Sequence, residues 1–333
     1  MLLKFFKGTG PGVIFMITIL FMVLWAGTFI HPEVLSDVSA ESAGMPLFNL
    51  LVSIFTPGHL PALFLSAALS VVMLFLLINF NTTIFFINER TFLPALLFIM
   101  FVGLFPEYQK LNPVLPASVM FMIALKRIMA GYHKQGIAYN FFDAGILIST
   151  GSLFYANLIW FGIIILIGII LLRTVSVSEI AVMLLGLITP YLVTFGLYYV
   201  VGYDLKVLLE IISGNLFTRS EVYNFSRPVI VTLILFAVIL VISTGYLLML
   251  QNSKKIKSRK TFSLLIWIFF ISVAVYFLVP SASVEVIWIT AIPASYILSH
   301  FYINSRNKIV SEILFTTVFL MILVIQGLYL FGV

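Results

Sequence analysis

Cysteine is absent from this 333-residue chain, and charged residues make up only 9% of it. Without cysteine the chain cannot form disulfides, thiolate nucleophiles, or cysteine-ligated zinc or iron–sulfur sites. The scarcity of charge excludes an ordinary soluble domain, which draws about a quarter of its residues from Asp, Glu, Lys and Arg. The chain also has no Walker loop, no His-Glu-x-x-His, no Gly-x-Ser-x-Gly and no Rossmann fingerprint, so the common soluble-enzyme sites are missing.

Apolar residues dominate the chain instead. Hydrophobic residues make up 62% of the sequence, and the mean hydropathy is +1.19. Several runs approach or exceed the roughly 20 residues that cross a hydrocarbon core. Inside lipid each segment must satisfy its own backbone hydrogen bonds, and the two-residue alternation of a membrane barrel is absent. The sequence therefore predicts an all-α polytopic membrane protein, with a single integral membrane domain over residues 1–333.

Hydropathy predicts about eleven transmembrane helices, with a range of 10–12. The first run is too long for a typical signal-peptide core, so we interpret it as a retained signal anchor. The expected spans are residues 12–30, 60–80, 91–105, 113–129, 142–155, 157–173, 179–201, 228–250, 262–279, 284–303 and 309–331.

The stretch 141–173 is long for one span and short for two, and the basic residues decide between these alternatives. A tight hairpin turning near residues 155–157 places 14 of the 18 Lys and Arg on one side of the membrane and four on the other. One long helix would give nine on each side. Because cytoplasmic loops carry an excess of Lys and Arg, we expect the hairpin, with a cytoplasmic N-terminus and an external C-terminus.

Two external loops are long enough to hold structure. The first, residues 31–59, contains three acids followed by an apolar segment at 45–55. The second, residues 202–227, begins with an amphipathic pattern at 204–212 and meets a helix-stop signal at 213–215. Both loops are expected to carry short helices that lie on the membrane surface.

The acids of the first loop are candidate catalytic residues. Glu33, Asp37 and Glu41 are spaced four residues apart, so they would line one face of a helix. A carboxylate at the membrane surface can act as a general base for an acceptor, or can hold a divalent cation. The alternative is an acidic, solvated loop. The four histidines are far apart in the sequence, and we assign no metal-ligating residues.

Two external arginines are candidate phosphate-binding residues. Arg219 and Arg227 follow the second amphipathic segment, where a guanidinium could bind the phosphate of a lipid carrier through two hydrogen bonds. The alternative is that both side chains simply reach toward lipid headgroups. Charged residues lie near the ends of the expected spans, which disfavours an ion-coupled transporter. Gly145, Ser149 and Ser152 share a helix face suited to close packing.

Two resemblances extend this interpretation. The stretch from Asn88 through Pro94 to Pro106, with 140–145 (Asn-Phe-Phe-Asp-Ala-Gly) and 152–155 (Ser-Leu-Phe-Tyr), resembles a family of uncharacterised multispanning bacterial inner-membrane proteins. That similarity covers most of the chain and implies architecture and a location in the bacterial inner membrane.

More distantly, the layout is similar to the GT-C superfamily of integral-membrane glycosyltransferases. Members have a cytoplasmic N-terminus, a catalytic acid soon after the first span and functional external loops after spans one and seven. The resemblance implies that Asp37 or Glu33 occupies the place of the catalytic acid and that Arg219 or Arg227 faces a polyprenyl phosphate. The chain departs from this pattern in lacking a clear paired-acid motif and a soluble catalytic domain.

The leading hypothesis is a GT-C-like protein that handles a lipid-linked sugar at the outer face of the membrane, with glycosyl transfer left open. The alternative is a non-catalytic subunit or scaffold of an inner-membrane complex, and the third is a lipid or solute transporter. Expected partners are membrane lipids, a polyprenyl-phosphate-linked sugar and membrane-protein subunits. Nucleic acid is not expected, because the basic residues sit in short loops between spans. No cofactor is identified beyond the divalent cation that the first loop could hold.

Overall fold

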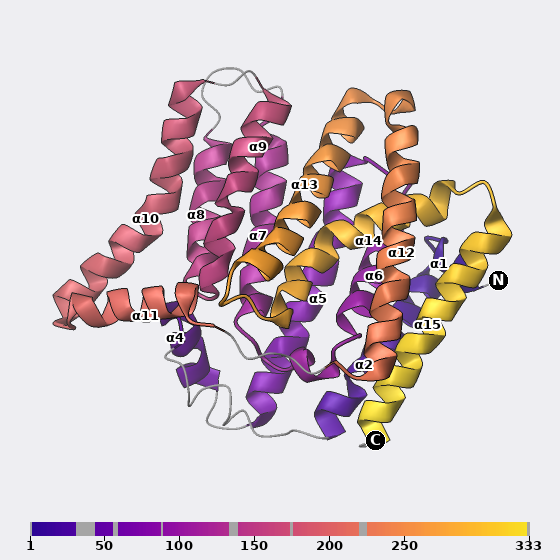
Figure 1. The fold of residues 1–333 in the computed structure, drawn as a ribbon, viewed down its shortest axis with the longest axis horizontal. Coiled ribbons are helices and arrows are strands. Elements are labelled where there is room, and N and C mark those ends of the chain that lie inside the picture. The colour runs from indigo at the N-terminus through magenta and orange to yellow at the C-terminus, as the bar shows by residue number, and fades with distance from the viewer. Residues whose placement is uncertain are drawn as a thin grey trace.

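The computed structural model describes residues 2–30, 44–55, 59–87, 89–132, 139–173, 176–219 and 225–331, and the regular elements of these residues are helices (Figure 1). The first half of the chain forms α1 (Leu2–Phe6), α2 (Pro11–Ile30), α4 (Pro46–Phe55), α5 (His59–Ile84), α6 (Leu93–Val102), η1 (Pro106–Gln109), α7 (Val114–Ala130), α8 (Asn140–Ser152), η2 (Ala156–Gly162) and α9 (Ile163–Leu172). The second half forms α10 (Val177–Val201), α11 (Leu205–Phe217), α12 (Arg227–Met249), η3 (Gln251–Ser253), α13 (Ile256–Leu278), η4 (Val284–Val286), α14 (Ile287–Asn304) and α15 (Lys308–Phe331).

Seven helices of the described chain are long and apolar enough to cross a membrane. They are α2, α5, α10, α12, α13, α14 with η4, and α15. The all-α membrane class is therefore supported, but the expected eleven full spans are not confirmed. The other four expected spans correspond to shorter helices: α6 has 10 residues, α7 has 17, α8 has 13 and α9 has 10 after the η2 turn. At 1.5 Å per residue, a ten-residue helix covers about half of a 30 Å hydrocarbon core.

Of the shorter helices, α6 lies entirely inside the protein, and so does most of the span-length helix α14. Every residue of α6 is buried, and 89% of the most apolar part of α14 is buried, whereas the corresponding share of α10 is 17%. Gln326 of α15 donates a hydrogen bond of 2.7 Å to the Gly103 carbonyl just after α6. An apolar run that faces other helices has the same composition as one that faces lipid, so hydropathy does not distinguish them.

The run 141–173 divides into two helices as expected. Helix α8 ends at Ser152 and η2 begins at Ala156, with η2 leading directly into α9. The turn between them covers residues 153–155, next to the expected turn near residues 155–157. Each of the two resulting helical segments is shorter than a typical span, because this hairpin packs within the bundle beside α7 and α10.

Helices α8 and α10 approach until their backbones touch, and glycines make this approach possible. A Cβ atom added to Gly145 would lie 2.9 Å from the Met183 carbonyl oxygen, and one added to Gly186 would overlap the carbonyl of Phe142. Small residues at helix interfaces allow this kind of packing in membranes. The expected packing face of α8 is confirmed, since Ser152 also hydrogen bonds to Tyr191 of α10 at 2.8 Å.

Candidate functional site at the α4–α11 end

Each of the two loops that were expected to carry a surface helix contains a helix in the structure. Helix α4 covers Pro46–Phe55, and α11 covers Leu205–Phe217. The Asp204 side chain caps α11 by accepting a 2.9 Å hydrogen bond from the Lys206 amide, and Gly202 adopts a φ of 85° that ends α10. Helix α11 does not stop at residues 213–215 as expected. It continues through Gly214 to Phe217, and the Asn215 side chain donates to the Ile211 carbonyl at 2.8 Å within the helix.

Helices α4 and α11 come from different loops but meet at one end of the bundle, toward the lower left of Figure 1. The meeting point is the turn between α8 and η2. The Leu47 amide donates a 3.1 Å hydrogen bond to the Leu153 carbonyl, so α4 is held to the turn by its backbone. A small apolar cluster joins the two helices to this turn: buried Met45, Leu153 and Ala156, with Leu47, Tyr191, Ile211, Ile212 and Leu216 packed against them. We call this region the α4–α11 end.

Polar side chains lie beneath the two helices. Ser281, in the turn between α13 and η4, has its Oγ 2.8 Å from the Leu216 carbonyl and 3.0 Å from Asn157 Oδ1. A hydroxyl has one proton, so it donates to one of these acceptors at a time. Asn157 Nδ2 in turn donates to the Tyr155 hydroxyl at 3.3 Å. This chain of contacts links η2, the end of α11 and the α13–η4 turn, and we call it the polar floor.

An ionisable pair borders the polar floor. Burial raises the pKa of Tyr155 above its ordinary value, and the nearby charge of Glu285 also raises it, whereas the hydrogen bond from Asn157 acts in the opposite direction. The phenol is therefore neutral at physiological pH and can donate a hydrogen bond. Glu285, in η4, is half-buried and so remains within reach of solvent. Sequence reasoning did not identify Glu285 as a site residue, because nothing local in the sequence relates it to residues 155–157.

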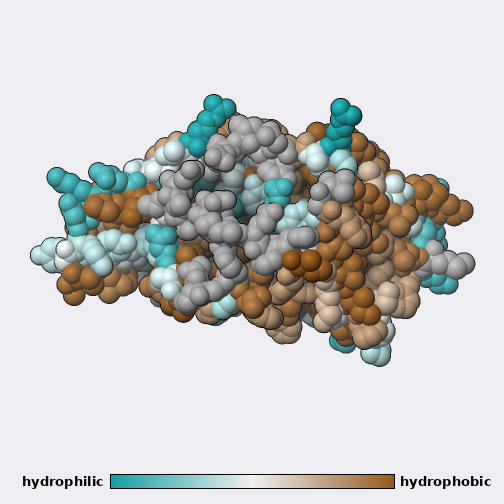
Figure 2. Space-filling view, turned by 90° about the horizontal axis from the view of Figure 1, so that it is seen from below, coloured by the Kyte–Doolittle hydropathy of each residue, from teal (hydrophilic) through white to brown (hydrophobic). Residues whose placement is uncertain are grey.

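A second set of polar contacts extends the same end toward α2. Trp288 Nε1 donates a 3.3 Å hydrogen bond to the Tyr108 carbonyl in η1, and Thr28 Oγ1 donates to Gln109 Oε1 at 3.1 Å. These contacts hold η1 between α14 and the end of α2. In Figure 2, which views the molecule from below, hydrophilic residues are seen along the left side beside hydrophobic ones, whereas the lower right is mainly hydrophobic.

The structure describes only some of the predicted site residues. Glu33, Asp37 and Glu41 lie outside the described residues. Arg219 follows α11 and Arg227 begins α12, and both are exposed. Their assignment to phosphate binding stays a prediction. So does the divalent cation of the first loop. Within the described ranges, no group of three or more His, Asp and Glu residues is placed to hold a metal ion.

Of the four histidines, His300 contributes to the packing of the core. It is fully buried in α14, with its ring centroid 4.9 Å from that of Phe262 and 6.4 Å from that of Tyr246. His31 and His133 lie outside the described residues. The ring of His300 therefore packs among aromatic side chains.

Comparisons with known proteins give one match. No curated protein matches the chain, and no solved structure matches it. The sequence pattern of a family described as "Family of unknown function (DUF6427)" matches residues 43–330. The match covers α4 to α15 and begins after Glu33, Asp37 and Glu41. Because it extends over most of the chain, the protein belongs to the DUF6427 family.

Proposed function

We propose that this protein handles a lipid-linked sugar at the membrane surface, at its α4–α11 end, in the manner of a GT-C glycosyltransferase. The observation that supports the proposal is the meeting of α4 and α11 on one turn, above the polar floor. Two helices from separate loops that pack against the same turn form one continuous surface, which we call the platform, at the boundary between membrane and water. A transporter would instead need a polar path through the bundle, whereas the centre of this bundle is filled by the buried helices α6 and α14.

The proposal gives each candidate residue a role. Arg219 and Arg227 border the segment after α11 and would bind the polyprenyl phosphate, since a guanidinium can donate two parallel hydrogen bonds to it. One of Glu33, Asp37 and Glu41 would act as general base toward the acceptor or hold a divalent cation. The described residues that flank this acidic segment are Ile30, which ends α2, and Gly44, which is next to Met45 of the apolar cluster. Gly44, the first described residue after the acidic segment, is therefore next to the platform.

Neutralising the acids tests this role. We expect Asp37→Asn, or Glu33→Gln if the second acid is the base, to reduce the surface glycan made by the cell about 100-fold or more, the usual loss when a general base is removed. Glu41→Gln is tested in parallel. The readout is the amount of glycan at equal protein level. Asp143→Asn serves as the matched control, because Asp143 lies in α8, where its partner is the exposed Arg127 at 3.7 Å.

The outcomes separate the competing functions. An unchanged glycan in all three acid variants and in the deletion strain would overturn the proposal. If the acids tolerate neutralisation and a second membrane protein copurifies in equal amount, the subunit interpretation replaces it. A monomer without companions, combined with loss of glycan in one acid variant only, supports the enzyme.

The proposal also requires the α4–α11 end to face outward, with the protein in the bacterial inner membrane. The chain has no cysteine, so single cysteines can report the side of the membrane without background labelling. We expect the S213C variant, in α11, to react with a membrane-impermeant maleimide in intact spheroplasts. The S253C variant, in η3 between α12 and α13, should react only after lysis. The reverse pattern would invert the topology and contradict the proposed location of the site.

A further inference from the structure

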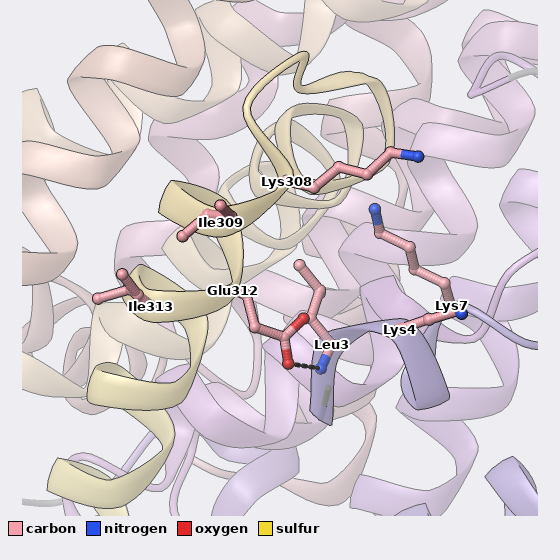
Figure 3. A pocket seen from close by; sticks show the side chains of 7 residues that line it. All are labelled: Leu3, Lys4, Lys7, Lys308, Ile309, Glu312 and Ile313. Atoms are coloured by element: carbon pink, nitrogen blue, oxygen red, sulfur yellow. Dashed lines mark hydrogen bonds between the residues drawn. The ribbon is translucent and has the colours of Figure 1, made fainter.

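A groove lies between the N-terminal helix and the start of the last helix, away from the α4–α11 end. It has a volume of about 460 Å³ and is lined by Leu3, Lys4, Lys7, Lys308, Ile309, Glu312 and Ile313 (Figure 3). Helix α1 is fixed to α15 by Phe6, whose ring lies 6.2 Å from that of Phe315 and 6.4 Å from that of Phe319. The groove is therefore a packed feature rather than a gap beside a free terminus.

The groove carries an excess of positive charge. Lys4 and Lys7 of the N-terminal segment and Lys308 of α15 contribute three ammonium groups. The one carboxylate in the lining, Glu312, is already engaged, because it accepts a 3.1 Å hydrogen bond from the Leu3 amide at the start of α1. Figure 3 shows Glu312 directed toward Leu3, while the lysine side chains lie on the other side of the groove.

The positive charges of Lys7 and Lys308 repel each other. Partial burial lowers the pKa of Lys7, and the charge of Lys308 lowers it further, although Glu89 and Glu312 act in the opposite direction. An anion placed between Lys7 and Lys308 would relieve this repulsion. Free surface lysines would instead extend away from each other into water.

The apolar residues of the groove show what kind of anion fits. Ile309 and Ile313 are one helical turn apart on α15 and are 73% and 58% exposed. They begin an apolar side of a helix that is long and apolar enough to cross the membrane. A ligand that satisfies both parts of the groove has a negatively charged head and a hydrocarbon chain.

From this geometry we infer that the groove binds the headgroup phosphate of an anionic phospholipid, such as phosphatidylglycerol, with an acyl chain along Ile309 and Ile313. The lipid contacts α1 and α15 together and so fastens the N-terminal segment to the bundle. This role is independent of the lipid-linked sugar proposed for the α4–α11 end. Clustered basic residues at a membrane surface typically attract anionic lipids by about 1 kcal/mol per lysine or arginine.

Lipid titration of the purified full-length protein tests the inference. Phosphatidylglycerol, phosphatidylcholine and inorganic phosphate are each added in detergent, and thermal unfolding is followed. We expect phosphatidylglycerol alone to raise the unfolding temperature. In a Lys7→Gln, Lys308→Gln double variant, its apparent affinity should fall roughly 25-fold, about fivefold for each lysine.

The controls distinguish a specific lipid-binding site from general electrostatic attraction between the lipid and basic residues on the surface. Lys255→Gln with Lys257→Gln removes the same charge from the α12–α13 connection, and should change the affinity less than twofold. Lys7→Arg with Lys308→Arg keeps the charges and should keep binding. Lys4→Gln, at an exposed position, removes one lysine charge of the groove. Its effect on the lipid affinity can be measured even if the double variant does not fold. Equal losses in both Gln double variants, or an effect of inorganic phosphate equal to that of the lipid, would overturn the inference.

Discussion

Gly186→Val should prevent the close packing of α8 against α10. Its loss of stability should exceed that of the other single substitutions proposed for this protein. The added side chain would meet the main chain of Phe142, which cannot move without shifting α8. Overpacking usually costs about 1–3 kcal/mol, and a clash with backbone on both sides lies at or above the upper end of that range. The measurement is the yield of monodisperse protein after detergent extraction, together with its unfolding temperature.

The matched control for this change lies in the same helix. A Cβ atom added to Gly196 meets nothing within 4 Å, so Gly196→Val changes the composition of α10 by the same amount without a steric clash. Gly186→Ala should be intermediate. If the two valine variants are equally stable, the close approach of α8 and α10 is not needed for the fold.

Glu179→Gln should give the second large effect, by breaking a buried ion pair. Arg173 follows α9 and Glu179 lies in the first turn of α10, with side chains 14% and 3% exposed. Removing one member of a buried pair typically costs about 3–5 kcal/mol, because the remaining charge stays in a low-dielectric environment. We expect a loss of roughly 3 kcal/mol, measured as a lower unfolding temperature in detergent and as faster proteolysis at the α9–α10 connection.

Two comparisons make this prediction specific. Replacing both partners, as in Arg173→Met with Glu179→Leu, should recover much of the stability, because two apolar side chains leave no uncompensated charge. Asp143→Asn breaks the Arg127–Asp143 pair, whose side chains are 54% and 43% exposed, and should cost less than about 1 kcal/mol. A double variant less stable than Glu179→Gln would show that the pair itself is strongly stabilising.

The long helices are the part of the fold that the sequence predicts best. The expected spans 12–30, 228–250 and 309–331 agree within one residue with α2, α12 and α15. These helices are predominantly apolar over 20 to 24 residues, so their existence follows from hydropathy. The division of residues 141–173 into a hairpin was also correct, because the asymmetry of basic residues is informative even where hydropathy is not.

The core and the site were much less predictable. Nothing in Leu93–Val102 distinguishes a helix enclosed by protein from one that faces lipid, so the complete burial of α6 could not be predicted from the sequence. The polar floor joins Ser281 to Asn157 and to Leu216, which are 124 and 65 residues away in the sequence. Such pairings depend on how the whole bundle packs. Only the polar character of Asn157, at the expected hairpin turn, pointed toward this region.

Helix α6 cannot be enclosed by protein until the C-terminal helices have been synthesised. Its enclosure requires α14, which packs along it, and Gln326 of α15, which caps its end, and both belong to the last part of the chain to be made. At about 5–20 residues per second, α6 waits on the order of ten to forty seconds for these partners to emerge. A ten-residue helix cannot span the bilayer alone during that interval. The nascent protein is therefore most vulnerable to membrane proteases and most dependent on the insertion machinery before its C-terminal helices are complete.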